Sequence, residues 1–285
     1  MSISQIIGPA AEPVALDDVL RDLGYGDSGS LDANTLEVLS GRLTPLIVAA
    51  RRSCESYQRR AYITQTLLLQ RDGFPGFSAR YERGGNPQIL IPKPPLQLIQ
   101  SFQYVDVAGI VQNLALDTTY GTNLLTYGYQ LDYGGDVLPA RVLPPFARPW
   151  PPNRLVPNSV MIQFVCGYGG PVTLSMTAAS AVISGATFLQ SDIGRLLSVP
   201  AAGTASATLN TSIAAVDGSG HATAADNCVT AAPGAVAYLG NPVPGEIVMA
   251  IRFLVQFYYE QGGSVDAPVP RIVRDMLGEV RNLTS

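Results

Sequence analysis

The side chains that could carry out chemistry are few. The 285 residues hold a single histidine, His221, in the turn-rich stretch Asp217-Gly-Ser-Gly-His. A zinc site built from histidine and cysteine needs further ligands at short spacings. The three cysteines, Cys54, Cys166 and Cys228, lie far apart in the sequence. The spacing therefore predicts no metal site, and it favours buried free thiols in a protein made in a reducing compartment.

Two motifs near the N-terminus are interpreted as chance matches. Gly26-Asp-Ser-Gly copies the tetrapeptide around a serine-protease nucleophile, and Gly24-Tyr-Gly-Asp-Ser-Gly fits the GxGxxG pattern of dinucleotide sites. The first motif needs a histidine and an aspartate presented from a β-barrel, but His221 lies far downstream. The second has meaning only between a strand and a helix. Here it follows a helical pattern, so its glycines are expected to end that helix.

No pair of carboxylates is spaced for acid–base catalysis. We therefore predict a protein that is not an enzyme and needs no cofactor. A hydrolase that uses Ser28 is the less favoured alternative.

The composition points to a surface that meets other subunits. Charged residues make up 14% of the chain, against about 25% in an ordinary soluble domain, while 47% are hydrophobic and the mean hydropathy is +0.19. Lys93 is the one lysine among 18 basic residues, and arginine suits packed interfaces better than lysine. The net charge of −4 argues against wrapping nucleic acid. No apolar run predicts a membrane span or a secretory signal.

Residues 1–62 are predicted to be helical. A first helix opens at Glu12, and a second spans Asp32–Ala61, where apolar residues recur every three or four positions. Pro45 either restarts this helix or kinks it. Four arginines occupy the opposite face and form either a solvated face or a subunit or partner interface: Arg51, Arg52, Arg59 and Arg60.

Residues 63–170 change to short strands separated by turn residues about every ten positions, the spacing of an antiparallel sandwich or barrel. Strands are expected at 63–70, 88–92, 99–106, 111–116, 127–133 and 160–166, with a turn at 74–77. A proline-rich break, 143–153, holds the only tryptophan, Trp150.

Residues 171–240 are rich in Ala, Ser, Thr and Gly and are predicted to be an inserted β module, with strands at 188–199, 207–213 and 228–230. Helical periodicity returns in 241–285, first after Pro244 and again after Pro270. The predicted fold class is α+β. N- and C-terminal helices form a small bundle beside an antiparallel β-sandwich or barrel-like domain that carries the inserted module.

Several motifs occur in an order that resembles a known family. They are Glu12-Pro-Val-Ala-Leu-Asp-Asp-Val, Leu46-Ile-Val-Ala-Ala-Arg-Arg, Tyr57-Gln-Arg-Arg-Ala, Ile89-Leu-Ile-Pro-Lys-Pro-Pro-Leu, Phe102-Gln-Tyr-Val-Asp, Trp150-Pro, Ile162-Gln-Phe-Val-Cys-Gly-Tyr-Gly, Pro244-Gly-Glu-Ile-Val-Met-Ala-Ile and Pro270-Arg-Ile-Val-Arg-Asp-Met-Leu. Over 1–169 and 241–285 the chain is similar to the head–tail connector (adaptor) proteins of tailed phages. Residues 171–240 depart from that pattern, and their Asp192-Ile-Gly-Arg resembles a motif in β modules of phage tail fibres and tailspikes.

The resemblance implies a structural virion protein at the neck, made in the host cytoplasm. Such adaptors form a ring, usually of twelve copies, beneath the portal protein. The ring extends the DNA channel and presents a surface to tail or neck proteins, which are a stopper, a tail terminator or a tail tube. Genomic DNA passes through without being read, and no membrane is involved.

The resemblance also implies that the C-terminal segment inserts between portal subunits. The candidate portal-binding residues are Arg271, Ile272, Arg274, Met276, Leu277, Val280, Arg281 and Leu283. The alternative is that this segment packs back on its own subunit. A second alternative for the whole protein is a carbohydrate- or receptor-binding tail protein that uses 171–240. That module holds only Phe188 and Tyr238 for stacking on a sugar, which argues against it.

Overall fold

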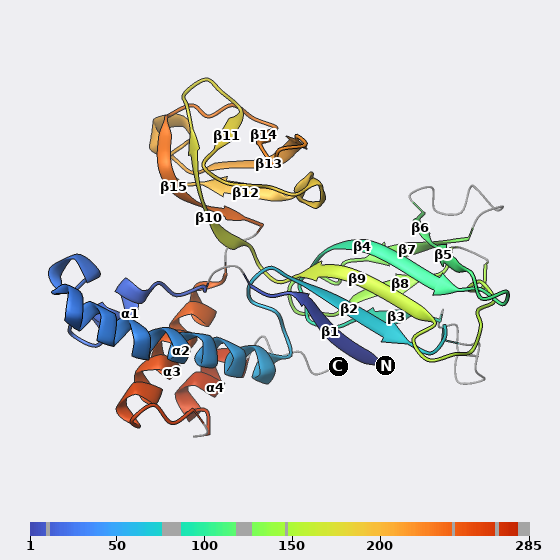
Figure 1. The fold of residues 1–285 in the computed structure, drawn as a ribbon, viewed down its shortest axis with the longest axis horizontal. Helices are drawn as coiled ribbons and strands as arrows, with labels where there is room; N and C mark the ends of the chain where they lie inside the picture. The colour runs from blue at the N-terminus through green and yellow to red at the C-terminus, as the bar shows by residue number, and fades with distance from the viewer. Residues whose placement is uncertain are drawn as a thin grey trace.

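The computed structural model describes residues 1–9, 12–75, 87–117, 127–145, 148–240, 243–265 and 268–278. The chain folds into an α+β structure of a helical body, a two-sheet β body and a smaller β-barrel (Figure 1). Each body has its own hydrophobic core.

The helical body combines the two ends of the chain. It contains α1 (Leu16–Asp22), α2 (Ala33–Gln58), α3 (Gly245–Glu260) and α4 (Arg271–Gly278). The Asp32 carboxylate caps α2 by accepting hydrogen bonds from the backbone N–H groups of Asn34 and Thr35, at 3.1 and 3.0 Å. Pro45 lies inside α2, so the helix is continuous and is not restarted there. The apolar faces of the four helices share one core, with Leu43, Ala50, Ile251, Leu254 and Val273 fully buried.

The β body is a sandwich of two sheets. The five-stranded sheet has the order β1 (Ser2–Ile7), β2 (Gln65–Arg71), β9 (Val160–Cys166), β4 (Leu96–Val105) and β5 (Val111–Asn113). The four-stranded sheet has the order β3 (Ile89–Ile91), β8 (Ala140–Leu143), β7 (Gly128–Asp132) and β6 (Ala115–Leu116). All pairs are antiparallel except β6 with β7. Alternate residues of both sheets face a common core that includes Leu69, Ile91, Phe102, Val142 and Ile162.

The barrel is formed by β10 (Gly170–Met176), β11 (Val182–Ser184), β12 (Leu196–Val199), β13 (Leu209–Val216), β14 (Ala222–Ala224) and β15 (Ala232–Leu239). Its ladder closes because β15 pairs with both β12 and β10. Small side chains such as Ala202, Ala222 and Ala237 fill much of its core. Gly170, where the chain enters, pairs with Leu239, where it leaves. The barrel is therefore joined to the rest of the molecule at adjacent points.

The strand predictions were wrong in several places. In the barrel, β10, β11, β14 and β15 were not predicted, and the strand expected at 188–199 is confirmed only at 196–199, because Gln190–Asp192 form a 3-10 helix. β1 and β8 were not predicted: β1 shows no alternation of buried and exposed residues, and β8 runs directly into a proline-rich segment. Cys228 is buried but lies in the connection between β14 and β15 and not in a strand. The expected turn at 74–77 extends into 76 and 77, which lie outside the described residues.

Candidate interaction surfaces

The residues of the protease-like motif are not assembled into a catalytic site. Ser28 lies in a short 3-10 helix beside α1, where its backbone N–H donates to the Asp17 carboxylate at 3.0 Å. His221 lies between β13 and β14 of the barrel, with its Nδ1 3.0 Å from Asp217 Oδ2. The serine and the histidine therefore belong to different bodies of the molecule (Figure 1).

In the described part of the chain, no side chains are arranged for metal binding or for thiol chemistry. Within it, no cluster of three or more His, Cys, Asp or Glu side chains is placed to hold a metal ion. Cys54, Cys166 and Cys228 are free and buried, as predicted. Burial raises the pKa of the Cys54 thiol to about 12, which keeps it protonated and unreactive. None of the described helices combines the length and the apolar character that crossing a membrane requires.

Two of the four candidate interface arginines are buried inside the chain. Arg51 donates through Nε to Glu12 at 2.6 Å and through a terminal nitrogen to Glu55 at 2.7 Å. The Arg60 guanidinium lies over the Tyr168 ring, 5.3 Å from its centroid, and donates to its hydroxyl. The exposed arginine face predicted for the long helix is thus wrong at Arg51 and Arg60. Both side chains are turned inward, toward acidic or aromatic partners that periodicity alone does not reveal.

Arg52 and Arg59 are exposed, so the interface hypothesis now rests on these two residues. Arg59 ends α2 in the left-handed conformation, with φ of 56°. Together with Arg71 and Lys93 it lines a cavity of about 750 Å³ that also includes Met1, Ile3, Ser56, Pro75, Gln88, Leu90, Pro92 and Pro139. No carboxylate is among these lining residues.

Helix α4 packs on its own subunit along one face. Val273 and Leu277 are fully buried in the helical core, and Met276 packs against it. The side-chain amide of Gln58, which is itself fully buried, donates to the Leu277 carbonyl at 2.8 Å. This bond satisfies a carbonyl at the C-terminal end of α4 that has no partner within the helix. The described part of the C-terminal segment therefore packs on its own subunit through its buried face, which is the alternative to portal binding that the sequence left open.

The opposite face of α4 is open. Arg271, Ile272 and Arg274 are exposed, and Ile272 retains 55% of its accessible surface. Arg271 Nε lies 3.6 Å from the Asp275 carboxylate. The remaining candidates for portal binding, Val280, Arg281 and Leu283, lie outside the described residues.

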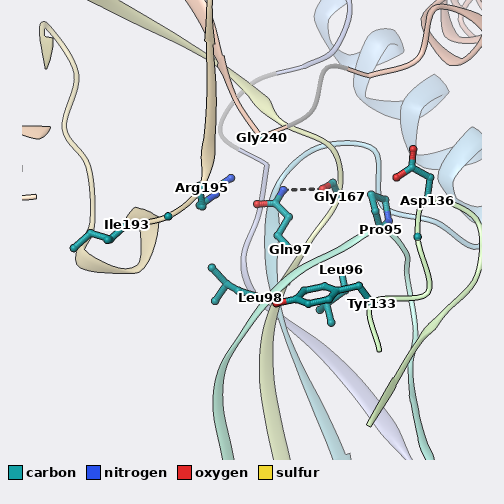
Figure 2. A pocket seen from close by; sticks show the side chains of 12 residues that line it. Pro95, Leu96, Gln97, Leu98, Tyr133, Asp136, Gly167, Ile193, Arg195 and Gly240 are labelled. Carbon is teal, nitrogen blue, oxygen red and sulfur yellow. Dashed lines mark hydrogen bonds between the residues drawn. The ribbon is translucent and has the colours of Figure 1, made fainter. Parts of the chain in front are cut away.

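The barrel is joined to the sandwich by a polar network around Arg195 (Figure 2). A terminal nitrogen of Arg195 donates to Thr64 Oγ1 at 3.0 Å and to the Leu239 carbonyl at 3.3 Å. The Gln97 amide donates to the same Thr64 oxygen at 2.9 Å and to the Gly167 carbonyl at 2.7 Å. Thr64 and Gln97 belong to the sandwich, so Arg195 is a direct link between the two bodies.

The Asp192-Ile-Gly-Arg motif builds this link. Asp192 accepts a hydrogen bond from the Leu189 N–H at 2.8 Å and pairs with Arg195 at 2.6 Å. Gly194 adopts a φ of 86°, which a side chain would strain. Sequence reasoning singled out the motif but did not find Thr64 and Gln97, because nothing in the sequence marks a polar contact across 131 positions.

A cavity of about 470 Å³ lies beside this link, and Figure 2 shows Tyr133 and Asp136 on its sandwich side and Ile193 on its barrel side. The side-chain oxygen of Gln97, Oε1, and Arg195 Nε are both buried and have no hydrogen-bond partner in the described structure. Phe188, one of the two aromatic residues a sugar could stack on in 171–240, is buried in the barrel core, with 2% exposure. The side chain of Tyr238, the second of these aromatic residues, is not among those that the structure describes.

Comparison with protein-family models gives no match, and comparison with curated protein sequences gives none either. Two solved structures share the fold over the whole chain. A chain in a structure described as "Neck of empty GTA particle computed with C6 symmetry" is 15% identical with a TM-score of 0.51, covering 100% of this chain and 97% of that one. A chain in "Virion of native gene transfer agent (GTA) particle" is 14% identical with a TM-score of 0.51 over the same shares.

Proposed function

We propose that this protein is a structural component of the neck of a phage-like particle. The observation that carries the proposal is the shared fold, which covers the helical body, the sandwich and the barrel together and leaves 3% or less of either chain unmatched. The structures that share it are of a neck and of a virion. The resemblance of the sequence motifs to head–tail adaptors supports the same role independently.

In this role the subunits form a ring beneath the portal and present a surface to a tail or neck protein. The low content of charged residues, 14%, supports a chain whose surface is largely covered by neighbours. The family resemblance implies twelve copies, a number compatible with the sixfold symmetry of one similar structure.

DNA passes through the ring without being read. The net charge of −4 leaves the chain without the excess of cations that neutralises phosphates. Tight, salt-sensitive binding of duplex DNA by the isolated protein would contradict this part of the proposal.

Portal contact is assigned to the open face of α4 and the segment that follows it. Arg271 and Arg274 provide positive charge there, and Ile272 provides an exposed apolar anchor. Charges at such a rim set orientation and association rate more than affinity. Because Val273 and Leu277 hold the other face on the subunit, α4 serves as a fixed platform.

The experiment is a binding assay between the wild-type protein and its portal, with the triple variant Arg271→Ala/Ile272→Ala/Arg274→Ala as the test and Arg252→Ala, on α3, as the control. The triple variant is expected to stay folded and to lose most portal binding. If it binds the portal as the wild type does, the contact lies elsewhere. If the wild type neither binds the portal nor forms rings, the neck function is contradicted.

A further inference from the structure

The N-terminal strand β1 has an unusual place in the sandwich. It pairs with β2 along Ser2–Ile7, but all six of its side chains are exposed. Ile3, Ile6 and Ile7 retain 43%, 51% and 51% of their accessible surface. Because about half of each isoleucine stays exposed, the strand gains only part of the hydrophobic stabilisation that full burial would give. Main-chain pairing with β2 and side-chain hydrogen bonds from Ser2 to Gln70 and from Gln5 to Gln65 hold the strand in place, and its exposed apolar surface is left open to a partner.

The free edge of β1 also lacks most of the features that prevent strand addition. Natural edge strands are protected by charged residues, prolines, bulges or covering elements. Residues 1–8, Met-Ser-Ile-Ser-Gln-Ile-Ile-Gly, contain no charged side chain and no proline. The one bulge lies between Gln5 and Ile7, so Ser2–Gln5 keep a regular register.

The other end of the same sheet is similar. β5 is its last described strand, and Val111 in β5 and Ile110 just before it are 51% and 59% exposed. Val107, in the turn that leads into β5, is 69% exposed. Exposed apolar side chains therefore lie at both ends of the sheet, and Gln112 and Asn113 make the rest of β5 polar.

A contact between two different faces of identical subunits is the kind that closes into a ring, whereas a face that contacts its own copy gives only a dimer. Resting on the proposed neck ring, we propose that the β1 edge of one copy pairs with the β5 edge of the next copy, so that the five-stranded sheets continue across the subunit boundary. Self-pairing of β1 would leave the β5 edge bare and end at two copies. The occupant of the β1 edge is thus a second copy of this chain.

The cavity of about 750 Å³ beside β1 fits this contact. Met1 and Ile3 line it together with Arg59 and Lys93. It provides room for side chains of the incoming strand. Arg59, a candidate for subunit contact from the sequence, would lie at the resulting boundary.

Thiol cross-linking tests the contact directly, because the three native cysteines are buried and react slowly. The test is the double variant Ile3→Cys/Val111→Cys, treated with a short bismaleimide after light scattering has confirmed that it assembles. The matched control is Val38→Cys/Val111→Cys, since Val38 on α2 is also exposed, at 71%. We expect a ladder of covalent species from dimer to full ring in the test variant and monomer in the control.

Three results would overturn the edge contact. A covalent dimer from Ile3→Cys alone would mean that β1 pairs with itself. Rings that give no ladder would place the subunit boundary elsewhere and leave the neck function standing. Wild-type protein that stays monomeric would remove the contact between copies, and portal binding would then decide the neck function separately.

Discussion

The side-chain amide of Gln58, at the end of α2, donates a 2.8 Å hydrogen bond to the backbone carbonyl of Leu277, at the end of α4. The Gln58 oxygen in turn accepts from the Tyr62 hydroxyl at 2.7 Å. One buried glutamine thus ties the C-terminal helix to the long helix and to Tyr62, in the segment that leads from α2 to β2. The position of the proposed portal platform depends on this residue.

Replacing Gln58 by alanine should loosen α4. The change leaves the Leu277 carbonyl and the Tyr62 hydroxyl without this partner, at a cost of about 1–3 kcal/mol. Hydrogen exchange of the α4 amides should become about fivefold to about 150-fold faster. The control is Gln256→Ala, which removes an exposed hydrogen bond to Glu260. Equal protection of α4 in both variants would mean that the hydrophobic contacts alone fix the helix.

Arg51 should be required for stability in a pH-dependent way. Burial raises the pKa of Glu55, and the charge of Arg51 only partly offsets that effect. Arg51→Ala leaves the Glu55 carboxylate buried without its ion-pair partner, which should cost about 3 kcal/mol near neutral pH. Arg52→Ala, on the neighbouring exposed residue, should change the free energy of unfolding by less than about 0.5 kcal/mol.

The loss in free energy of unfolding caused by Arg51→Ala should become smaller as the pH falls. A carboxyl group with a raised pKa in the folded state binds its proton more tightly when folded, so protonation stabilises the fold. Urea unfolding at neutral pH and at about pH 5 measures the difference between variant and wild type. A penalty that stays constant or grows on acidification would show that Glu55 is not the group left unpaired.

Arg195 should hold the barrel against the sandwich. Arg195→Ala removes its bonds to Thr64 and Leu239 and its ion pair with Asp192, but it removes no apolar side chain from the barrel core. We expect the barrel to stay folded and to move relative to the sandwich, with faster hydrogen exchange around Thr64 and a larger radius of gyration by small-angle scattering. His221→Ala, at an exposed turn of the same barrel, is the control. An unchanged scattering profile would show that the two connecting strands alone fix the barrel.

The barrel should also be removable. Gly170 and Leu239 are paired neighbours, and a Cβ on Gly240 would lie 2.9 Å from the Cα of Gly169, so a short Gly-Ser link can replace 171–240. Among the side chains that the structure describes, none from that segment belongs to the helical or the sandwich core. The shortened protein should fold with a Tm within about 5 °C of the wild type. Aggregation or loss of cooperative unfolding would show that the barrel belongs to the core.

The parts of the fold that follow from local periodicity were predictable. The apolar spacing of α2 and α3 and the regular turns of the sandwich identify their elements. Gly24 follows the end of α1 with a φ of 83°, as expected for a glycine that ends a helix, whereas Gly29 lies in the short 3-10 helix with Ser28. β1 was missed because an edge strand with only exposed side chains has no alternating pattern.

The candidate surfaces were less predictable because they depend on contacts that are distant in sequence. Arg51 and Arg60 share a face with exposed arginines in a helical projection, but Glu12 and Tyr168 turn them inward. The sequence made Leu277 a candidate for portal binding, but in the structure it is buried in the helical core. Whether such a side chain is buried or exposed depends on tertiary packing, which the local sequence pattern does not reveal.

The central claim, a neck ring that docks on the portal, is tested most directly by cryo-electron microscopy of the wild-type protein mixed with the portal of its particle. The account predicts a closed ring of this chain against the portal, with α4 at the contact and the sheets of neighbouring copies joined edge to edge. Portal particles that carry no density for this chain, with the protein remaining monomeric in the same sample, would contradict it.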